Sequence, residues 1–412
     1  MKKAYLIVLT ALSIIILSWF LPWLYSLVFP ASGNDPFVAY SPISNEFIVS
    51  QTGEEKGVRI FGVDSLGHAT GKEYTKEDRD SLLPQIYFTQ LLAHDKLPDS
   101  INGVEISMPI FKHSQWVFNS TPRDINKNLA DVYLIMESMP ERFELEDPKE
   151  VFRMNDKIEF IDIETNTVNQ NRSRRFTDIF TDRGFKYPAR SMSANITSRK
   201  AYDEGYLMVD TEGDIYHVKM QAGRPYMVKV RKPDSIKGAH VFIMENMDTR
   251  HLGLVTDEND NLYALEHEGY RLVKLPIGKF HPSTDRLTVV KNIFNWVVKV
   301  NDGKSSRWVA FDSDSYRPLG YYSITTTKSA IETTADYLFP FRLSFTDVSD
   351  CFARPRIEDI SWHAIWIGII LALVTVIIGR RRKLSTKQIT INGIVTVVFG
   401  IFAFIPVICI KN

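Results

Sequence analysis

The chain has 412 residues, 44% of them hydrophobic, which is enough for a sizeable core in one large domain or two smaller ones. Its 49 basic and 49 acidic residues cancel, but residues 1–30 and 361–412 hold eight basic residues and no acid, which leaves the middle with 41 basic against 49 acidic residues. This mildly acidic middle argues against a nucleic-acid-binding protein, and two cysteines, Cys351 and Cys409, cannot form a disulfide framework.

The first element is an uncharged apolar run from Ala4 to Phe29. A helix of about 20 apolar residues crosses the hydrocarbon core of a bilayer, so this run is long enough to span. A cleaved signal peptide is the alternative, because "MKK" precedes the run and small residues follow it. The run exceeds the apolar part of a typical signal peptide, and Trp19 and Trp23 fit an interfacial aromatic belt. We therefore predict a retained transmembrane anchor in residues 1–30.

Residues 31–360 predict β-hairpins, because short segments rich in Val, Ile, Tyr and Phe alternate with Asp, Asn and Gly turns. Three segments share one pattern of strand, acidic turn, aromatic-led strand, second turn and strand. They are "YLMVDTEGDIYHVKMQAGRPYMVKV" from Tyr206, "HLGLVTDENDNLYALEHEGYRLVKL" from His251 and "WVVKVNDGKSSRWVAFDSDSYRPLGYY" from Trp296. A weaker copy, "IEFIDIETNTVNQN", precedes them, and Phe37–Gln51 could start another.

The aromatic residues after the first turn, Tyr216, Tyr263 and Trp308, are 47 and 45 residues apart, and Val168 of the weaker copy lies 48 residues before Tyr216. A period of about 45 residues with several strands is typical of a β-propeller blade, since one blade cannot bury both of its faces alone. We expect a mainly β, propeller-like domain outside the cytoplasm. Another all-β arrangement, such as an antiparallel sandwich, and a mixed α+β fold remain alternatives.

A helical insertion interrupts this pattern at Tyr74–Gly103. Thr75 followed by Asp78 resembles a capping box, and Pro84 is tolerated in a first turn if the helix begins nearer Asp80. The insertion could cover the β domain or dock a partner.

Two further apolar runs, Ser361–Gly379 and Ile389–Ile410, predict a transmembrane hairpin with a basic loop at 380–388. The loop carries Arg380, Arg381, Arg382, Lys383 and Lys387 and no acid. The positive-inside rule places this loop, and an N-terminus with two lysines, in the cytoplasm. The predicted order is therefore N-terminus in, residues 31–360 out, loop in and C-terminus out. This placement argues against a nucleic-acid role for the loop, whereas contact with anionic lipid headgroups stays open.

The sequence contains no recognisable catalytic motif: H-E-x-x-H, G-x-S-x-G, a P-loop and G-x-G-x-x-G are all missing, and the nine histidines are scattered. We accordingly predict no catalytic residue, cofactor or metal site. The acidic segments Asp210–Asp214, Asp257–Asn261 and Asp312–Ser315 resemble calcium loops only in part, and tight β-turns need the same residue types. The basic cluster Arg172–Arg175 predicts a polar loop, solvated or in contact with lipid phosphate. Cys351 and Cys409 could approach each other outside the cytoplasm.

The segments "LSWFLPWLYSLVFP…PFVAYSPISNEFIVS" and "LLPQIYFTQLLAHDKLPDSINGVEIS", the strand repeats and the C-terminal hairpin together resemble an uncharacterised family over essentially the whole chain. This family consists of membrane-anchored proteins of Gram-negative bacteria, catalogued as a domain of unknown function. The resemblance transfers no catalytic residue. It implies genes beside those of ABC-transporter ATPases and permeases, and hence an accessory role.

Three functions compete on this basis. The first is a non-enzymatic accessory subunit of an inner-membrane complex of the ABC-transporter type, whose periplasmic β domain binds a partner or substrate. The second is a stand-alone membrane-anchored protein for ligand binding or sensing. The third is a membrane-tethered hydrolase with catalytic residues from separate blades. The two extra C-terminal helices favour the first, because a protein that needs only a tether would stop at one helix.

Overall fold

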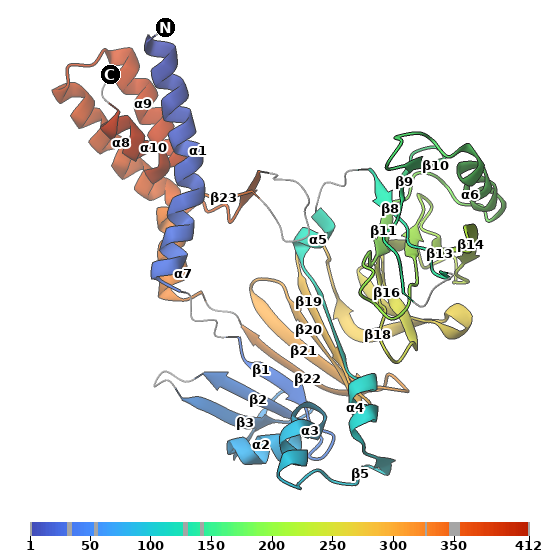
Figure 1. Cartoon of the computed structure of the whole chain (residues 1–412). Helices are drawn as coiled ribbons and strands as arrows, with labels where there is room; N and C mark the ends of the chain where they lie inside the picture. The colour runs from blue at the N-terminus through green and yellow to red at the C-terminus, as the bar shows by residue number, and fades with distance from the viewer. Residues whose placement is uncertain are drawn as a thin grey trace. The chain divides into compact units, whose positions relative to one another are not determined.

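The computed structural model describes residues 2–30, 35–52, 57–126, 131–140, 144–325, 328–345 and 355–410 (Figure 1). The chain divides into two compact parts, a sheet domain of residues 35–326 and a helical unit of residues 1–34 with 327–412. The sequence suggested a boundary at residue 360 instead. The difference arises because α7 (Ala330–Leu338) and the short strands β23 (Arg342–Ser344) and β24 (Arg356–Glu358) belong with the apolar helices.

The sheet domain is mainly β, as predicted, and its described residues form five antiparallel sheets of three or more strands besides the small β5–β6 hairpin. The first holds β1 (Phe37–Tyr40), β2 (Phe47–Thr52), β3 (Val58–Val63) and β4 (Ala69–Glu73). The second holds β8 (Tyr133–Leu134), β9 (Glu150–Met154) and β10 (Ile158–Asp162), and the third β11 (Ser191–Ala194), β12 (Tyr206–Val209), β13 (Ile215–Gln221) and β14 (Arg224–Lys229). The fourth holds β15 (Gly238–Ile243), β16 (His251–Asp257), β17 (Asn261–Glu266) and β18 (Leu272–Lys279). The fifth holds β19 (Arg286–Lys291), β20 (Asn295–Asn301), β21 (Ser305–Asp312), β22 (Pro318–Thr325) and β7 (Trp116–Ser120).

The three predicted repeats form β12–β14, β16–β18 and β20–β22, and each gains one preceding strand to make a four-stranded meander. The segment from Phe37 likewise starts a sheet of its own. The prediction of a weaker repeat at "IEFIDIETNTVNQN" is wrong. After β10 the chain makes one isolated bridge, between Ile161 and Val168, and then enters helix α6 (Gln170–Asp182). The reason is a helix start at Asn169, whose side chain accepts a hydrogen bond from the Arg172 amide.

The basic cluster Arg172–Arg175 therefore lies on a helix, and its prediction as a loop is wrong. Phe176 and Phe180 of α6 are fully buried against the second and third sheets, whereas Arg174 and Arg175 are exposed. The pattern is that of an amphipathic surface helix, in which the arginines occupy the solvated side.

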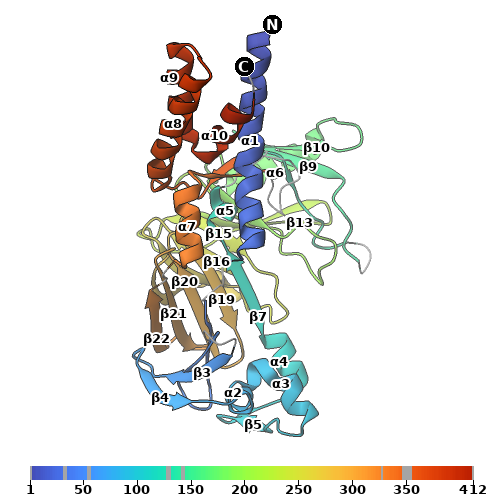
Figure 2. The ribbon, with the colours of Figure 1, turned by 90° about the vertical axis from the view of Figure 1, so that its left-hand side faces the viewer.

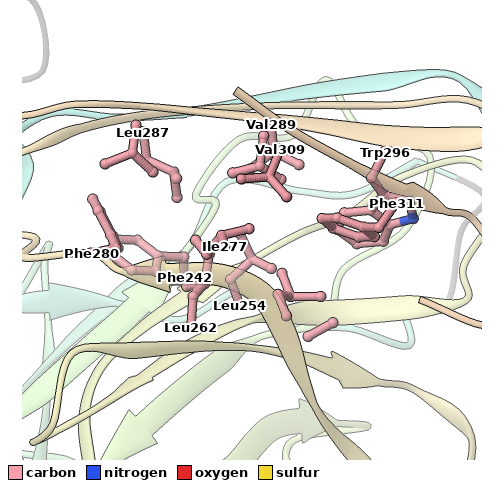
Figure 3. Close-up of a cluster of buried hydrophobic side chains, with 14 of the residues drawn as sticks. Phe242, Leu254, Leu262, Ile277, Phe280, Leu287, Val289, Trp296, Val309 and Phe311 are labelled. Carbon is pink, nitrogen blue, oxygen red and sulfur yellow. The ribbon is translucent and has the colours of Figure 1, made fainter. Parts of the chain in front are cut away.

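Successive sheets stack on one another through buried apolar clusters. The largest cluster lies between the fourth and fifth sheets, where Phe242, Leu254 and Phe280 face Leu287 and Trp296 (Figure 3). Similar clusters join the third sheet to the fourth, the second to the third, and the first to the fifth. Each sheet thus buries a face that it could not bury alone, as in propeller blades.

The stack does not close into a ring. Among the described residues, no buried apolar cluster joins the first sheet to the second. Instead β7 pairs with the free edge of β19, from Leu287 opposite Ser120 to Lys291 opposite Trp116. In a closed propeller the first strand of each blade lines a central channel, so β7 occupies the edge that such a channel would need.

The helical insertion is confirmed, but it contains two helices, α2 (Lys76–Leu82) and α3 (Pro84–Ala93). Thr75 and Asp78 form the predicted capping box, and Pro84 starts α3 at its first position. Leu83, between the helices, is buried with Ile48 and Ile60 of the first sheet, so the insertion covers that sheet. The remaining short elements of the sheet domain are β5 (Ser100–Ile101), β6 (Val104–Glu105), α4 (Met108–Ser114), α5 (Pro122–Asn126) and η1 (Glu268–Tyr270).

In the helical unit, α1 (Lys2–Val28), α8 (Ala364–Arg381), α9 (Thr386–Phe399) and α10 (Ile401–Cys409) lie side by side (Figure 2). The antiparallel helices α8 and α9 meet through small residues. The buried positions of α8 are Ala364, Gly368, Ala372, Thr375 and Gly379. A Cβ added to Gly368 would lie 2.8 Å from the Val397 carbonyl oxygen, so the two backbones approach closely. Small residues are typical where apolar helices associate without a hydrophobic driving force.

The prediction of one helix over Ile389–Ile410 is wrong. The helix breaks at Gly400, whose φ of 55° and ψ of −132° favour glycine, and α10 begins after it. Arg382, next to the end of α8, donates a hydrogen bond from Nη2 to the Ile408 carbonyl oxygen at 2.8 Å. Since α9 runs antiparallel to α8, this contact means that α10 turns back beside the hairpin. Two helical segments within the described residues are therefore long and apolar enough to cross a membrane, Tyr5–Val28 and Ala364–Arg381.

Cys409 ends α10 and is an exposed free thiol. Cys351 lies outside the described residues, so the approach of these two cysteines stays a prediction.

The close packing around Gly253 generates a first prediction. A Cβ at Gly253 of β16 would lie 2.3 Å from the Phe242 carbonyl oxygen and 2.6 Å from Leu207 Cδ1. We expect Gly253→Ala to lower the free energy of unfolding by about 1–3 kcal/mol, because backbone and core must move apart. Gly57→Ala is the control, since nothing lies within 4 Å of its added Cβ, and it should change the stability by less than about 0.5 kcal/mol. Equal denaturant midpoints for the two variants would contradict the close packing.

Candidate functional site

The five basic residues singled out in the sequence meet at one turn. Arg380 and Arg381 close α8, Arg382 caps it, Lys383 adopts a left-handed backbone with φ of 56°, and Lys387 lies in the first turn of α9. All five are exposed. The C-terminal end of a helix carries partial negative charge, which favours the arginines at the end of α8. Residues 361–410 contain no acid, so no nearby carboxylate in this segment offsets the positive charge of the turn.

A cavity of about 540 Å³ opens within the helical unit, between the end of α1, helix α7 and residues 359–363. Tyr25, Phe29, Phe339 and Trp362 contribute aromatic walls. Charged side chains line it as well, and two ion pairs are among them: Arg342 with Asp359 at 3.3 Å and Lys328 with Asp336 at 2.5 Å. Such a cavity suits an amphipathic molecule, and its charges carry no arrangement of nucleophile and base.

Two buried histidines of the sheet domain form polar contacts that the sequence did not reveal. His217 Nε2 lies 2.7 Å from the Glu204 carbonyl oxygen, to which it must donate, so Nδ1 accepts the Tyr270 hydroxyl at 2.8 Å. Burial, together with the nearby positive charge of Lys219, lowers the pKa of His217 to about 4. The imidazole is therefore neutral and fixed in one tautomer.

The second histidine, His251 on β16, lies one sheet further along. The Tyr316 hydroxyl donates to Glu266 Oε1 at 2.9 Å and lies 2.8 Å from His251 Nε2. Burial lowers the pKa of His251 to about 4 and raises that of Tyr316. Glu266 also accepts two hydrogen bonds from Arg271, at 2.6 and 2.8 Å. The Glu266 carboxylate is therefore charged, and its hydrogen bonds are made within the fold.

Tyr270 and Tyr316 occupy equivalent places in successive sheets. Each lies in the turn before the last strand, 46 residues apart, with φ of 53° and 57°, and each reaches back to a histidine of the preceding sheet. A Tyr-Arg pair recurs at both turns, Tyr270-Arg271 and Tyr316-Arg317, and this repetition was the available sequence signal. The contacts tie neighbouring sheets together, and His217, His251 and Tyr316 are too deeply buried to meet a substrate.

The acidic segments act as turns. Asp257 Oδ1 accepts the amides of Asn259 and Asn261 at 2.9 Å each, and Oδ2 accepts the Tyr263 hydroxyl at 2.9 Å. Burial would raise the pKa of Asp257, yet these hydrogen bonds and that of the Asn261 side chain lower it overall. Asp210 likewise accepts hydrogen bonds from the amides of Glu212 and Asp214 and from the Tyr216 hydroxyl. Within the described part of the chain, no three His, Cys, Asp or Glu side chains are placed to hold a metal.

Comparison with known proteins gives a family but no activity. Residues 37–311 match the family described as "Domain of unknown function (DUF4857)". The chain belongs to the DUF4857 family. No curated protein matches it.

Solved structures similar to this DUF4857 protein include β-propellers. The Cps50 (Swd1) β-propeller domain of Myceliophteria thermophila is 13% identical with a TM-score of 0.26, covering 50% of this chain and 58% of that one. The Dos1 propeller is 11% identical with a TM-score of 0.29, covering 72% and 62%. Apo AztD of Citrobacter koseri is 9% identical with a TM-score of 0.23, covering 72% and 76%. The chain spans about three-fifths of the length of the first two, and its own strand pairing defines the fold.

The DUF4857 match includes both histidines and Tyr270 but ends before Tyr316 and the C-terminal helices. The basic turn and the cavity of the helical unit thus lie outside the matched residues.

The neutral, buried state of His217 predicts a pH-dependent stability. Its pKa of about 4 in the folded chain lies below the ordinary 6.5, so the unfolded chain takes up the proton first as the pH falls. The stabilisation is complete above pH 6.5 and decreases toward pH 4, by up to about 3 kcal/mol. We expect His217→Gln to flatten the decline of the unfolding free energy across this window. The exposed His113→Gln should keep the wild-type slope, and identical slopes in all three proteins would contradict the assignment.

The contact of Tyr316 with the preceding sheet gives a further prediction. Tyr316→Phe removes a hydroxyl that serves both His251 and Glu266, so we expect the free energy of unfolding to fall by about 1–3 kcal/mol. Tyr321→Phe, at a side chain that is 46% exposed, is the matched control and should stay within about 0.5 kcal/mol of wild type. Denaturant unfolding of the intact chain measures both, and equal effects would rule out the proposed tie between sheets.

Proposed function

We propose that the chain is a non-enzymatic accessory subunit of an inner-membrane complex, anchored by α1 and the α8–α9 hairpin. The observation that carries this proposal is the uncovered apolar surface of the two long helices. Only 11% of the Tyr5–Val28 window and 28% of the Ala364–Arg381 window is buried, whereas the core helix of a soluble domain is mostly buried. A bilayer is the solvent that such surfaces suit.

The exposed residues of the hairpin support the same environment. Ile370, Leu373 and Ile377 of α8, and Ile391 and Val398 of α9, are each at least half exposed, while the small residues face inward. The backbone break at Gly400 also suits this setting. Gly400 is buried, its amide donates to the Thr396 carbonyl, and its carbonyl accepts from Phe404. Irregular backbone at membrane depth requires such internal partners.

Charge sets the orientation that we propose. The basic turn between α8 and α9 lies in the cytoplasm, together with the N-terminus, according to the positive-inside rule. The sheet domain then lies in the periplasm, where it binds a partner or substrate. Because α10 turns back beside α8, we propose that Ile408 lies on the same side as the basic turn, unlike the outward C-terminus predicted from charge.

The hairpin argues for a subunit rather than a tethered domain. One spanning helix is enough for a tether, and α8 and α9 add apolar surface that a neighbouring membrane protein can cover. The partners that the family resemblance implies are the permease and ATPase of an ABC transporter. The buried histidines hold the sheets together, which leaves them without a catalytic role. The cavity beside α1 favours a second candidate, a stand-alone membrane-anchored protein that binds an amphipathic ligand.

Affinity purification of the tagged chain from gently solubilised native membranes tests the proposal. We expect the chain to sediment with membranes after alkaline carbonate washing and to co-purify stoichiometrically with an ABC permease and ATPase. Deletion of residues 361–412 should abolish the co-purification, because it removes the hairpin. Leu66→Ser, at an exposed turn of the sheet domain, is the control and should retain it. A chain that elutes alone and monodisperse would exclude the accessory role.

A further inference from the structure

A groove of about 680 Å³ runs along the α8–α9 hairpin. Its walls are apolar and its floor includes two small residues, Ala372 and Gly393. The wall residues are Ile369, Leu373, Val376, Ile389, Ile394 and Val397. Three of them, Ile369, Leu373 and Ile394, are exposed, so the apolar lining is accessible from outside the hairpin.

The groove ends at a positive charge. Arg380 lines one end together with Thr386 and Thr390, and no hydrogen bond or ion pair engages its side chain among the residues that the structure describes. Its neighbour Arg382 differs, because it donates to the Ile408 carbonyl. No acidic residue lies within residues 361–410, so the field at this end is uniformly positive.

The length of the groove indicates what occupies it. On α9 the lining extends from Thr386 to Val397, which is about 17 Å at about 1.5 Å per residue. That is close to one leaflet, half of a hydrocarbon core of about 30 Å. A partner helix would need a groove across the whole bilayer, whereas one acyl chain needs only one leaflet.

We propose that this groove binds one anionic phospholipid, with an acyl chain along α8 and α9 and its phosphate at Arg380. The inference rests on the membrane placement given under the proposed function. Charge complementarity selects an anionic headgroup over a zwitterionic one, since basic pockets between spanning helices attract anionic lipid. Arg380 contacts the phosphate, whereas Arg381 is not part of the groove lining and adds only diffuse charge.

Native mass spectrometry of the delipidated full chain in non-ionic detergent tests this site, with phosphatidylglycerol and phosphatidylethanolamine as probes at equal concentration. We expect wild type to retain one phosphatidylglycerol in preference to phosphatidylethanolamine. Arg380→Gln should weaken phosphatidylglycerol binding about fivefold or more, the effect of one basic side chain near an anionic lipid. Arg381→Gln is the matched control, with the same charge change outside the groove, and should bind like wild type.

A second variant probes the apolar part. Gly393→Leu adds a side chain into the groove and should lose both lipids, while circular dichroism reports whether the helices persist. Equal losses of phosphatidylglycerol binding in Arg380→Gln and Arg381→Gln, or no loss in either, would overturn the site. A helix of a co-purified protein that occupies the groove in place of lipid would overturn it as well. If the chain instead stays in the soluble fraction after cell lysis, the proposed function itself fails, so the two failures are distinguishable.

Discussion

The stacking of one sheet on the next is the interaction on which the sheet domain depends. A four-stranded meander has two faces, and here each apolar face is buried by the adjoining sheet rather than by a central core. Gly253 leaves room for the Leu207 side chain of the third sheet against the backbone of the fourth. The hydroxyls of Tyr270 and Tyr316 then add directional contacts to this non-directional packing, because each can bond only one histidine of the preceding sheet.

Those contacts bury the imidazoles of His217 and His251 inside the domain. A buried polar group destabilises a fold unless its hydrogen bonds are satisfied, so the same contacts disfavour other registers between sheets. Burial keeps His217 and His251 neutral, and the hydrogen bonds from Arg271 keep Glu266 charged. The buried hydrogen bonds of the domain therefore fix how neighbouring sheets pack. The helical unit carries two further hollows, the cavity beside α1 and the groove of the hairpin.

Sequence reasoning found what local chemistry decides. The capping box at Thr75, the Asp257 turn and the three meanders follow from residue types and spacing, and each is present in the structure. It failed where a single residue ended an element that the surrounding pattern predicted to continue. Asn169 starts a helix within an apparent β repeat, and Gly400 breaks the apolar run Ile389–Ile410, which was predicted to form one transmembrane helix. The recurring Tyr-Arg pair marks equivalent turns but does not identify the histidine partners, because these depend on which sheets adjoin.

The place of the first sheet has a consequence for how the domain forms. Its Val38, Phe47 and Val49 pack on Val297 and Trp308, and the Tyr40 carbonyl accepts a hydrogen bond from Asn295, 255 residues away. A ribosome makes the first sheet long before the fifth, so this face stays uncovered during most of synthesis. The opposite face, with Ile48 and Ile60, is covered by the next helices almost at once. Contacts between such distant segments slow folding, and exposed strands invite aggregation meanwhile. The domain thus completes its fold only at its last sheet, in an order imposed by topology.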